Sequence, residues 1–155
     1  ISGKSDYKNK KIILEKLKNN KIDIIFGTHA IFQKKISYKK LGLIIIDEQH
    51  KFGVNQRKKI NFNLQNNLIN KLSFSLTNDQ VNSLKEINKD LSTSTKMFRL
   101  LQGDVGSGKT IIALLSAYNT INSGYQVAFM APTEILARQH YNLAKEIFPG
   151  SKKIE

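Results

Sequence analysis

The feature that most constrains the fold of this 155-residue chain is a glycine-rich loop that ends in Lys-Thr. Residues 103–110 (GDVGSGKT) match the pattern G-x-x-x-x-G-K-[ST] at every fixed position. A mostly apolar run, residues 98–102, precedes the loop, and a helix-length segment, residues 109–121, follows it. Glycines let the backbone N–H groups and the positive end of a helix surround a phosphate. The loop therefore predicts a strand, a phosphate site and a helix, in that order.

The remainder of the chain alternates short β-rich runs with helix-length segments. This alternation is typical of an α/β fold with a mostly parallel sheet and helices on both faces. We expect residues 1–155 to form a single domain, in which the Asn/Gln-rich residues 58–71 are a linker. Further strands are predicted at residues 22–26, 43–46 and 126–130, and further helices at residues 8–18, 77–91 and 133–147.

Charge and composition narrow the class of protein. The formal net charge is +13 with a pI near 9.9, which favours a polyanionic partner such as nucleic acid. Lys, Ile and Asn have AT-rich codons, so genome composition is an equally good source of that charge. The absence of Cys excludes disulfides and Cys-ligated metal sites. The apolar runs are shorter than the roughly 20 residues that cross a bilayer, and no signal peptide is recognisable after Ile1, so we expect a cytoplasmic protein.

Two carboxylates follow the apolar run at residues 43–46. Asp47 and Glu48 stand at the end of a predicted strand, where α/β sheets bind ligands. A strand that ends in Asp-Glu is common on its own, but beside a phosphate loop the pair predicts nucleotide hydrolysis. Lys109 is then predicted to reach the β- and γ-phosphates. Thr110 and Asp47 are predicted to hold Mg²⁺, and Glu48 to orient and deprotonate the attacking water.

Longer segments around these residues resemble one family of proteins. They are LLQGDVGSGKT at the loop, APTEILARQHY at residues 131–141, GTHA at residues 27–30 and DEQHKFGVNQR at residues 47–57. Together they resemble the first motor domain of RecG-type DNA helicases of superfamily 2. The resemblance implies a RecA-like P-loop NTPase fold, ATP and Mg²⁺ as cofactors, and helicase activity on branched or single-stranded DNA in repair and recombination. It also implies a second RecA-like lobe and a wedge domain in the full-length protein.

Two other functions remain open at this point. One is a fragment that binds nucleotide or DNA without turnover, and the other is a lobe of the transcription–repair coupling translocase. That translocase is typified by an aromatic residue after the second loop glycine and by DEEQ in place of DEQH, so Ser107 and His50 favour the RecG type. No arginine of the chain matches the arginine-finger motif of the second lobe, so we expect the chain by itself to be nearly inactive.

The resemblance also assigns roles to individual residues. Residues 72–80 (LSFSLTNDQ) resemble the Q motif, in which Gln80 would read the adenine edge. The residues expected to couple nucleotide state to DNA are Gln49, His50 and Arg57. The nucleotide-binding set is Gln80, Gly103, Asp104, Val105, Gly106, Ser107, Gly108, Lys109 and Thr110. The DNA-binding set is Pro132, Thr133, Glu134, Ser2, Gly3, Lys4, Thr28 and His29.

Several of these residues also have purely structural explanations. Pro132 and Thr133 fit the start of a helix, where Thr133 would serve as the N-cap. Residues 2–3 fit an ordinary turn, and His29 fits a loop histidine with its hydrogen bonds satisfied. His140, in the following helix, is expected on the exposed surface.

The order of the motifs departs from the family. Residues 1–57 carry GTHA and DEQH, which the family places after the loop, whereas residues 72–155 carry the Q motif, the loop and APTE. Joining Glu155 to Ile1 restores the family order, so the chain is interpreted as a circular permutation or as an artefact of sequence assembly. If the permutation is real, residues 152–155 and 1–2 should be two halves of one strand.

The chain also lacks the S/T-A-T motif III that the family places after DEQH. By the resemblance, the strand of that motif lies between the loop strand and the strand that ends at Asp47. We therefore expect a gap, or a re-pairing of strands, in the middle of the sheet. The approach of Asp47 and Glu48 to Thr110 should be imperfect for the same reason.

Overall fold

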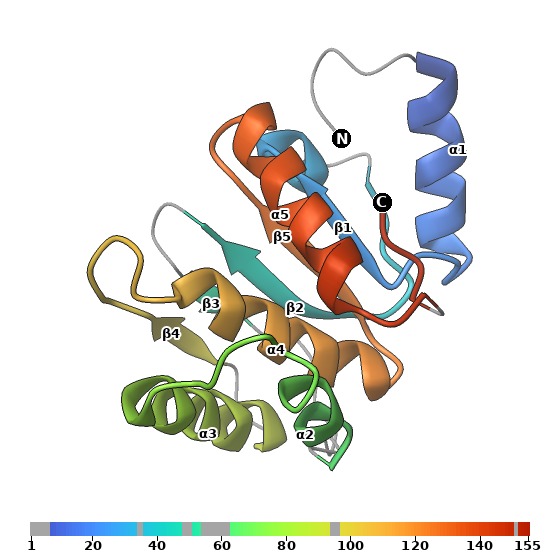
Figure 1. The fold of residues 1–155 in the computed structure, drawn as a ribbon. Helices are drawn as coiled ribbons and strands as arrows, with labels where there is room; N and C mark the ends of the chain where they lie inside the picture. The colour runs from blue at the N-terminus through green and yellow to red at the C-terminus, as the bar shows by residue number, and fades with distance from the viewer. Residues whose placement is uncertain (1–6, 34–35, 48–50, 54–62, 94–96, 151) are drawn as a thin grey trace.

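The computed structural model describes residues 7–33, 36–47, 51–53, 63–93, 97–150 and 152–155 (Figure 1). Each predicted strand and helix is present, with its ends within two residues of the prediction. The strands are β1 (Ile24–Gly27), β2 (Leu41–Ile46), β3 (Lys51–Gly53), β4 (Phe98–Leu100) and β5 (Gln126–Met130). The helices are α1 (Tyr7–Lys18), α2 (Asn63–Ile69), α3 (Asn78–Ser92), α4 (Lys109–Asn122) and α5 (Glu134–Ile147), with a 3₁₀ helix at His29–Phe32.

The strands are ordered β1-β5-β2-β3-β4, and among the described strands β3 alone runs against the others. At one edge the strands end in register, because Gly27 pairs with Met130 and Met130 pairs with Ile46. Ile46 also pairs with Lys51, which pairs in turn with Leu100. The carboxyl ends of β1, β5, β2 and β4 therefore lie along one edge of the sheet.

Strand β3 is the re-pairing that the missing motif III strand predicts. It lies between β2 and β4 and pairs antiparallel with both. Its three residues are too few to show the alternating pattern by which strands are recognised in a sequence. The chain thus fills the middle of the sheet with the segment that follows DEQH.

The carboxyl-terminal residues extend the sheet beyond β1. Ile154 forms a parallel bridge with Ile24. The Glu155 N–H donates to Ile24 O (3.1 Å), and the Phe26 N–H donates to Glu155 O (2.8 Å). One of the two predicted half-strands, residues 152–155, is therefore found beside β1, while Ile1 and Ser2 lie outside the described residues.

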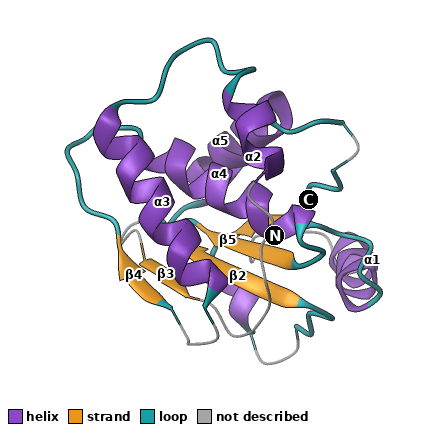
Figure 2. Cartoon of the chain, turned by 90° about the horizontal axis from the view of Figure 1, so that it is seen from below, coloured by secondary structure: helices purple, strands orange, loops and turns teal. Residues whose placement is uncertain are grey.

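Helices cover both faces of the sheet, although not equally. On one face, Phe26, Leu43 and Phe129 of the strands share a core with residues of α2 to α5. Figure 2 shows these four helices on the same side of the sheet. On the other face, Ile25 and Ala128 pack with Leu17 of α1 and with the 3₁₀ helix. The α/β architecture with a mostly parallel sheet is therefore confirmed.

Helix α4, which follows the glycine-rich loop, is buried from Ile111 to Ile121. Its buried hydroxyls return hydrogen bonds to the preceding turn, from Ser116 Oγ to Ile112 O (2.8 Å) and from Thr120 Oγ1 to Ser116 O (3.0 Å). Asn119 Nδ2 on the same helix donates to Asn88 Oδ1 on α3 (2.8 Å). Polar residues can therefore occupy a helix that would otherwise need to be apolar on every side.

The predicted linker at residues 58–71 contains a helix. Residues 63–69 form α2, and Leu68 on this helix is only 2% exposed and belongs to the core around α4. Asn66 and Asn67 lie on its exposed side. The predicted linker thus contains a helix that its Asn-rich sequence does not favour, because tertiary burial of one apolar residue stabilises it.

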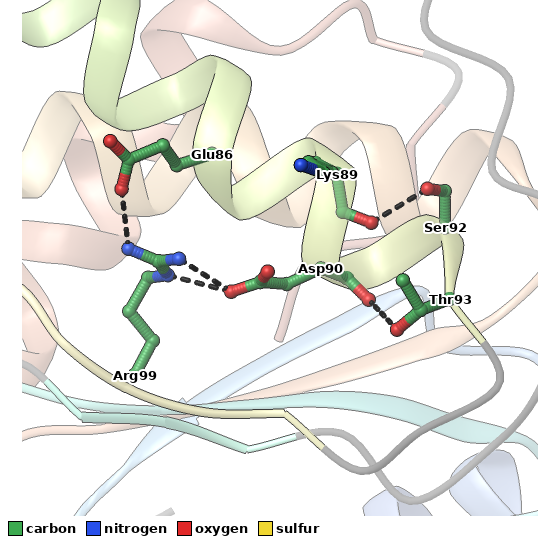
Figure 3. A network of polar contacts seen from close by, with 6 residues as sticks. All are labelled: Glu86, Lys89, Asp90, Ser92, Thr93 and Arg99. Carbon is green, nitrogen blue, oxygen red and sulfur yellow. Dashed lines mark hydrogen bonds and ion pairs between the residues drawn. The ribbon is translucent and has the colours of Figure 1, made fainter.

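Strand β4 is attached to α3 by a branched ion pair (Figure 3). Arg99 Nε donates to Asp90 Oδ2 and Nη1 donates to Glu86 Oε2, both at 2.7 Å. Hydrogen bonding to Asp90, followed by its charge and by the contacts with Glu86, raises the pKa of the Arg99 guanidinium above its ordinary value. The hydroxyl of Thr93 caps the same end of α3 by donating to Asp90 O (2.8 Å).

Candidate functional site

The glycine-rich loop joins the carboxyl end of β4 to the amino terminus of α4. Helix α4 begins at Lys109, and its N-cap is Gly108 in the left-handed conformation, with φ 82°. Gly106 has φ 81°, which also favours glycine. A Cβ at Gly108 would lie 2.3 Å from Gln80 Nε2, so a side chain there would displace the Gln80 amide. The predicted positions of Lys109 and Thr110 at a helix N-terminus are therefore confirmed.

Lys109 folds back over the loop. Its Nζ donates to Gly103 O (2.8 Å) and to Asp104 O (2.6 Å), and it lies 3.5 Å from Ser107 Oγ. The loop itself is exposed, with Val105 fully open to solvent. A cavity of about 410 Å³ lies beside it and is lined by Thr77, Asp79, Gln80, Ser83, Leu101, Gln102, Gly103, Asp104, Gly106, Ser107, Lys109 and Ile112.

Gln80 connects the first turn of α3 to this loop. Its Nε2 donates to Ser107 O (2.9 Å), while its Oε1 accepts from the Thr77 N–H (2.9 Å). The Gln80 N–H donates in return to Thr77 Oγ1 (3.3 Å), which completes a capping box. Thr77 is therefore the N-cap of α3, and Gln80 lines the cavity beside the loop.

Asp47 lies at the same edge of the sheet, directly after β2. Its N–H donates to Met130 O (2.9 Å) and so continues the ladder between β2 and β5. Because β3 intervenes, β2 and β4 are two strand spacings apart, or about 10 Å. Asp47 is not among the residues that line the cavity of the loop. Strand β3 thus occupies the place of the missing strand between β2 and β4, and the expected imperfect approach of Asp47 to Thr110 stays a prediction. Glu48, Gln49, His50 and Arg57 lie outside the described residues.

The Asp47 carboxylate contacts His140, which the sequence predicts on the exposed surface of α5. His140 on α5 lies with Nε2 2.8 Å from Asp47 Oδ2, and the two side chains are 9% and 13% exposed. The expectation that His140 is a surface residue is thus wrong. Its spacing from Ala137 and Ala144, which are also buried, places it on the inner face of α5 and could have indicated this.

The predicted DNA-facing residues that the structure describes lie at the other end of this edge. Thr28 and His29 follow β1, and Pro132 to Glu134 follow β5. Thr133 is the N-cap of α5, since its Oγ1 accepts from the Leu136 N–H (3.3 Å). Residues of both turns, Thr28 and Glu134, line one cavity of about 360 Å³. Its other lining residues are Ile13, Phe26, Gly27, Ala137, Arg138, Tyr141, Asn142 and Glu155. Ser2, Gly3 and Lys4 lie outside the described residues.

Two classes of site are not found among the described residues. Within those ranges, His, Cys, Asp and Glu form no group of three or more that could hold a metal ion. None of the described helices combines the length and the apolar character that a membrane span requires.

Comparison with known proteins gives relatives that share one description. The chain is 46% identical over 121 residues to the ATP-dependent DNA helicase RecG of Borreliella burgdorferi. This match covers 76% of the chain and 18% of the relative. It is 43% identical over 122 residues to RecG of Aquifex aeolicus, a match that covers 76% of the chain and 15% of the relative. It is 54% identical over 80 residues to RecG of Bacillus subtilis, where the match covers 52% of the chain and 12% of the relative. The chain thus spans less than a fifth of the length of these relatives.

No solved structure gives a significant match to the chain. The family assignment rests on a family model instead, which matches the chain in two segments. Since the model of the DEAD/DEAH box helicase family matches residues 1–87 and residues 77–155, the chain belongs to that family.

Proposed function

We propose that the chain is the nucleotide-binding lobe of a cytoplasmic, RecG-type ATP-dependent DNA helicase, which couples ATP hydrolysis to movement on branched DNA. Residues 1–57 and 72–155 are two parts of one RecA-like domain in this proposal. The observation that carries it is the position of residues 103–110, between the end of β4 and the start of α4. The relatives named above are RecG helicases, and they give no support to the transcription–repair coupling alternative.

The residues at the loop fit a nucleotide. The cavity of about 410 Å³ falls within the range of roughly 300–1,000 Å³ that is usual for small-molecule sites. Lys109 Nζ contacts backbone carbonyls that are exposed, so it can exchange them for the β- and γ-phosphates of a nucleotide. Gly103 to Gly108 would surround the phosphates with backbone N–H groups. Gln80, which lines the same cavity, would read the adenine edge.

Thr110 and Asp47 are the residues that would hold Mg²⁺. In nucleotide sites Mg²⁺ takes one or two protein carboxylates together with phosphate oxygens and water, and when bound it neutralises charge on the phosphates. Glu48, directly after Asp47, would orient the attacking water and accept its proton. Gln49, His50 and Arg57 would then couple the nucleotide state to DNA.

DNA would bind at the β1 and β5 end of the same edge. The candidate contacts there are Thr28, His29 and residues 132–134, and Ser2, Gly3 and Lys4 belong to the same proposal. The net charge of +13 supports binding of a polyanion, through release of counterions from the phosphate backbone. Both proposed sites therefore share one edge of one sheet.

Movement on DNA would require parts beyond this chain. Arg99 is engaged by Asp90 and Glu86, and Arg138 lies 3.9 Å from Glu134, so neither is placed as an arginine finger. Such a finger is typically worth about 10³–10⁵ in rate. We expect it from the second RecA-like lobe, with junction binding from the wedge domain, so the chain alone should hydrolyse ATP very slowly and unwind nothing.

Titration of the chain with a fluorescent ADP analogue, with and without Mg²⁺, tests the proposal. Lys109→Ala should weaken binding at least 10-fold, because it removes charge-assisted hydrogen bonds worth about 1.5–3 kcal/mol. Lys85→Ala, an exposed lysine on α3, is the matched control and should bind as the unaltered chain does. Equal loss in both variants, or no binding by the unaltered chain, would contradict the proposal.

Phosphate release with and without branched DNA tests the catalytic part. Glu48→Gln should keep nucleotide binding and remove any residual turnover, because it keeps the shape of the side chain and removes the base. DNA-stimulated hydrolysis at several turnovers per second by this chain alone would contradict the need for a second lobe.

A further inference from the structure

The hydrogen bond between His140 and Asp47 joins two elements that the proposed function uses separately. Asp47 follows β2 on the nucleotide side, whereas α5 begins at Thr133 and Glu134 on the side proposed for DNA. The Nε2–Oδ2 distance is 2.8 Å and both side chains are largely buried. Since a carboxylate can only accept, His140 Nε2–H is the donor. His140 is a buried ionisable residue with no role in the nucleotide site proposed above.

The surroundings of His140 hold its ring in one place. The ring lies 4.9 Å from that of Phe129, centroid to centroid and tilted by 37°. Phe129 is itself 1% exposed and lies on β5, the strand next to Asp47. Ala137 and Ala144, one turn to either side, are small and buried, so α5 packs closely on the sheet at this point. The packing therefore fixes the direction in which His140 Nε2–H donates to Asp47.

We propose that His140 is a positioning residue for Asp47, which sets the orientation of the carboxylate that contacts nucleotide-bound Mg²⁺. This inference rests on the proposed function. Ligands of a metal are commonly oriented by a hydrogen bond from a neighbouring group, and loss of that group typically costs about 10–100-fold in metal affinity. Oδ2 is held by His140, so the carboxylate cannot rotate freely about its last bond. The same hydrogen bond connects the carboxylate to α5, and other residues of this helix, among them Glu134 and Arg138, line the cavity at Thr28.

A purely structural role of the pair makes a different prediction. If the bond only stabilises the packing of α5 on the sheet, its loss should lower stability and weaken nucleotide binding equally with and without Mg²⁺. If His140 orients a metal ligand, its loss should leave metal-free nucleotide binding unchanged. The two roles are therefore separated by the dependence on Mg²⁺ and not by binding alone.

The experiment is a titration of the 155-residue chain with fluorescent ADP in EDTA, followed by titration with Mg²⁺ at fixed ADP. His140→Leu keeps the bulk against Phe129 and removes the donor, whereas His140→Gln keeps an amide N–H at about the position of Nε2. We expect equal ADP affinity in EDTA for all three proteins. The Mg²⁺ concentration at half-saturation should rise about 10-fold or more in the Leu variant and return to within about 3-fold in the Gln variant.

His140→Asn is a second variant in case the Leu variant does not fold. Its amide is too short to reach Asp47 as Nε2 does, and it should behave like the Leu variant with respect to Mg²⁺. Equal Mg²⁺ half-saturation in the unaltered and Leu or Asn proteins, or a matching loss in EDTA, would overturn the positioning role. Failure of the unaltered chain to bind ADP at all would overturn the proposed function, and this inference with it.

Discussion

At one end of the sheet, β1 and β5 are buried along their whole length, whereas at the other end β4 leaves Phe98 and Leu100 87% and 51% exposed. The buried end consists of parallel strands that carry helices on both faces. The other end carries two three-residue strands, β3 and β4, which pair in an antiparallel ladder. The loop at residues 103–110 follows β4 at this end of the sheet.

This difference separates the source of stability from the proposed site. Apolar burial contributes about 25 cal/mol per Å² of area removed from water, so a side chain buried on β1 or β5 stabilises the fold more than an exposed one on β4. The exposed end contributes less burial but leaves the loop open to a ligand. Strand β4 is held instead by polar contacts, of which the Arg99 ion pair is the main example.

The largest difference between the two ends should appear on truncation of an aromatic residue. Phe129→Ala removes a ring that is 1% exposed and contacts the rings of Phe26 and His140, so it should lower the free energy of unfolding by about 3–5 kcal/mol. Phe98→Ala, at the exposed end, should change it by less than about 0.5 kcal/mol. Urea unfolding measures both, and equal losses would contradict the comparison.

A smaller loss is expected within the loop itself. Gly108→Ala places a side chain at φ 82° and 2.3 Å from Gln80 Nε2, so it strains the backbone and displaces a hydrogen-bonded amide. The expected loss of unfolding free energy is about 2–3 kcal/mol. Gly106→Ala is the matched control, since φ at Gly106 is 81° but no atom lies within 4 Å of an added Cβ. The expected loss of unfolding free energy there is about 1 kcal/mol.

Urea unfolding of the two glycine variants measures this difference. If Gly106→Ala proved as costly as Gly108→Ala, the contact with Gln80 would have no influence and backbone strain alone would explain the loss. The loop would then be independent of α3, contrary to the hydrogen bond from Gln80 to Ser107.

These contacts also indicate how far the sequence could predict the structure. The loop, the caps at Thr77 and Thr133 and the parallel strands depend on local pattern, and the structure agrees with each of them. Strand β3 and helix α2 depend on pairing and burial that short or Asn-rich segments do not reveal. The bond from His140 to Asp47 joins residues 93 positions apart, which no local pattern specifies.

The ion pair of Arg99 should contribute a modest amount to stability. Arg99→Ala removes two hydrogen bonds that attach β4 to α3, but the side chain is 30% exposed and solvent screens the interaction. We expect a loss of about 1 kcal/mol, reduced by added salt. Arg138→Ala, whose contact with Glu134 is at 3.9 Å and exposed, should change stability by less than about 0.3 kcal/mol.

The smallest effect concerns the buried end and depends on pH. Tyr38 Oη donates to Ile31 O (2.8 Å), and burial raises the pKa of the Tyr38 phenol above its ordinary value near 10. The folded state therefore favours the neutral phenol. The contribution of the neutral phenol to stability is fully present below about pH 10, the pKa of tyrosine in the unfolded chain. It is lost as the pH rises above that value towards the raised pKa of the folded chain, at up to about 1.4 kcal/mol per pH unit.

Tyr38→Phe isolates this contribution, because the lysines that titrate in the same range are common to both proteins. At pH 7–9 the variant should be less stable by about 0.5–1 kcal/mol, since a partly buried hydrogen bond is lost and Ile31 O is left without its Tyr38 donor. Above pH 10 the unaltered chain should lose stability faster than the variant, so that the gap closes and then reverses. Urea midpoints of the two proteins from pH 7 to pH 11 measure it. A gap that stays constant over that range would mean that the phenol ionises equally easily in the folded and unfolded chain, and that the buried end is not as dry around Tyr38 as its packing indicates.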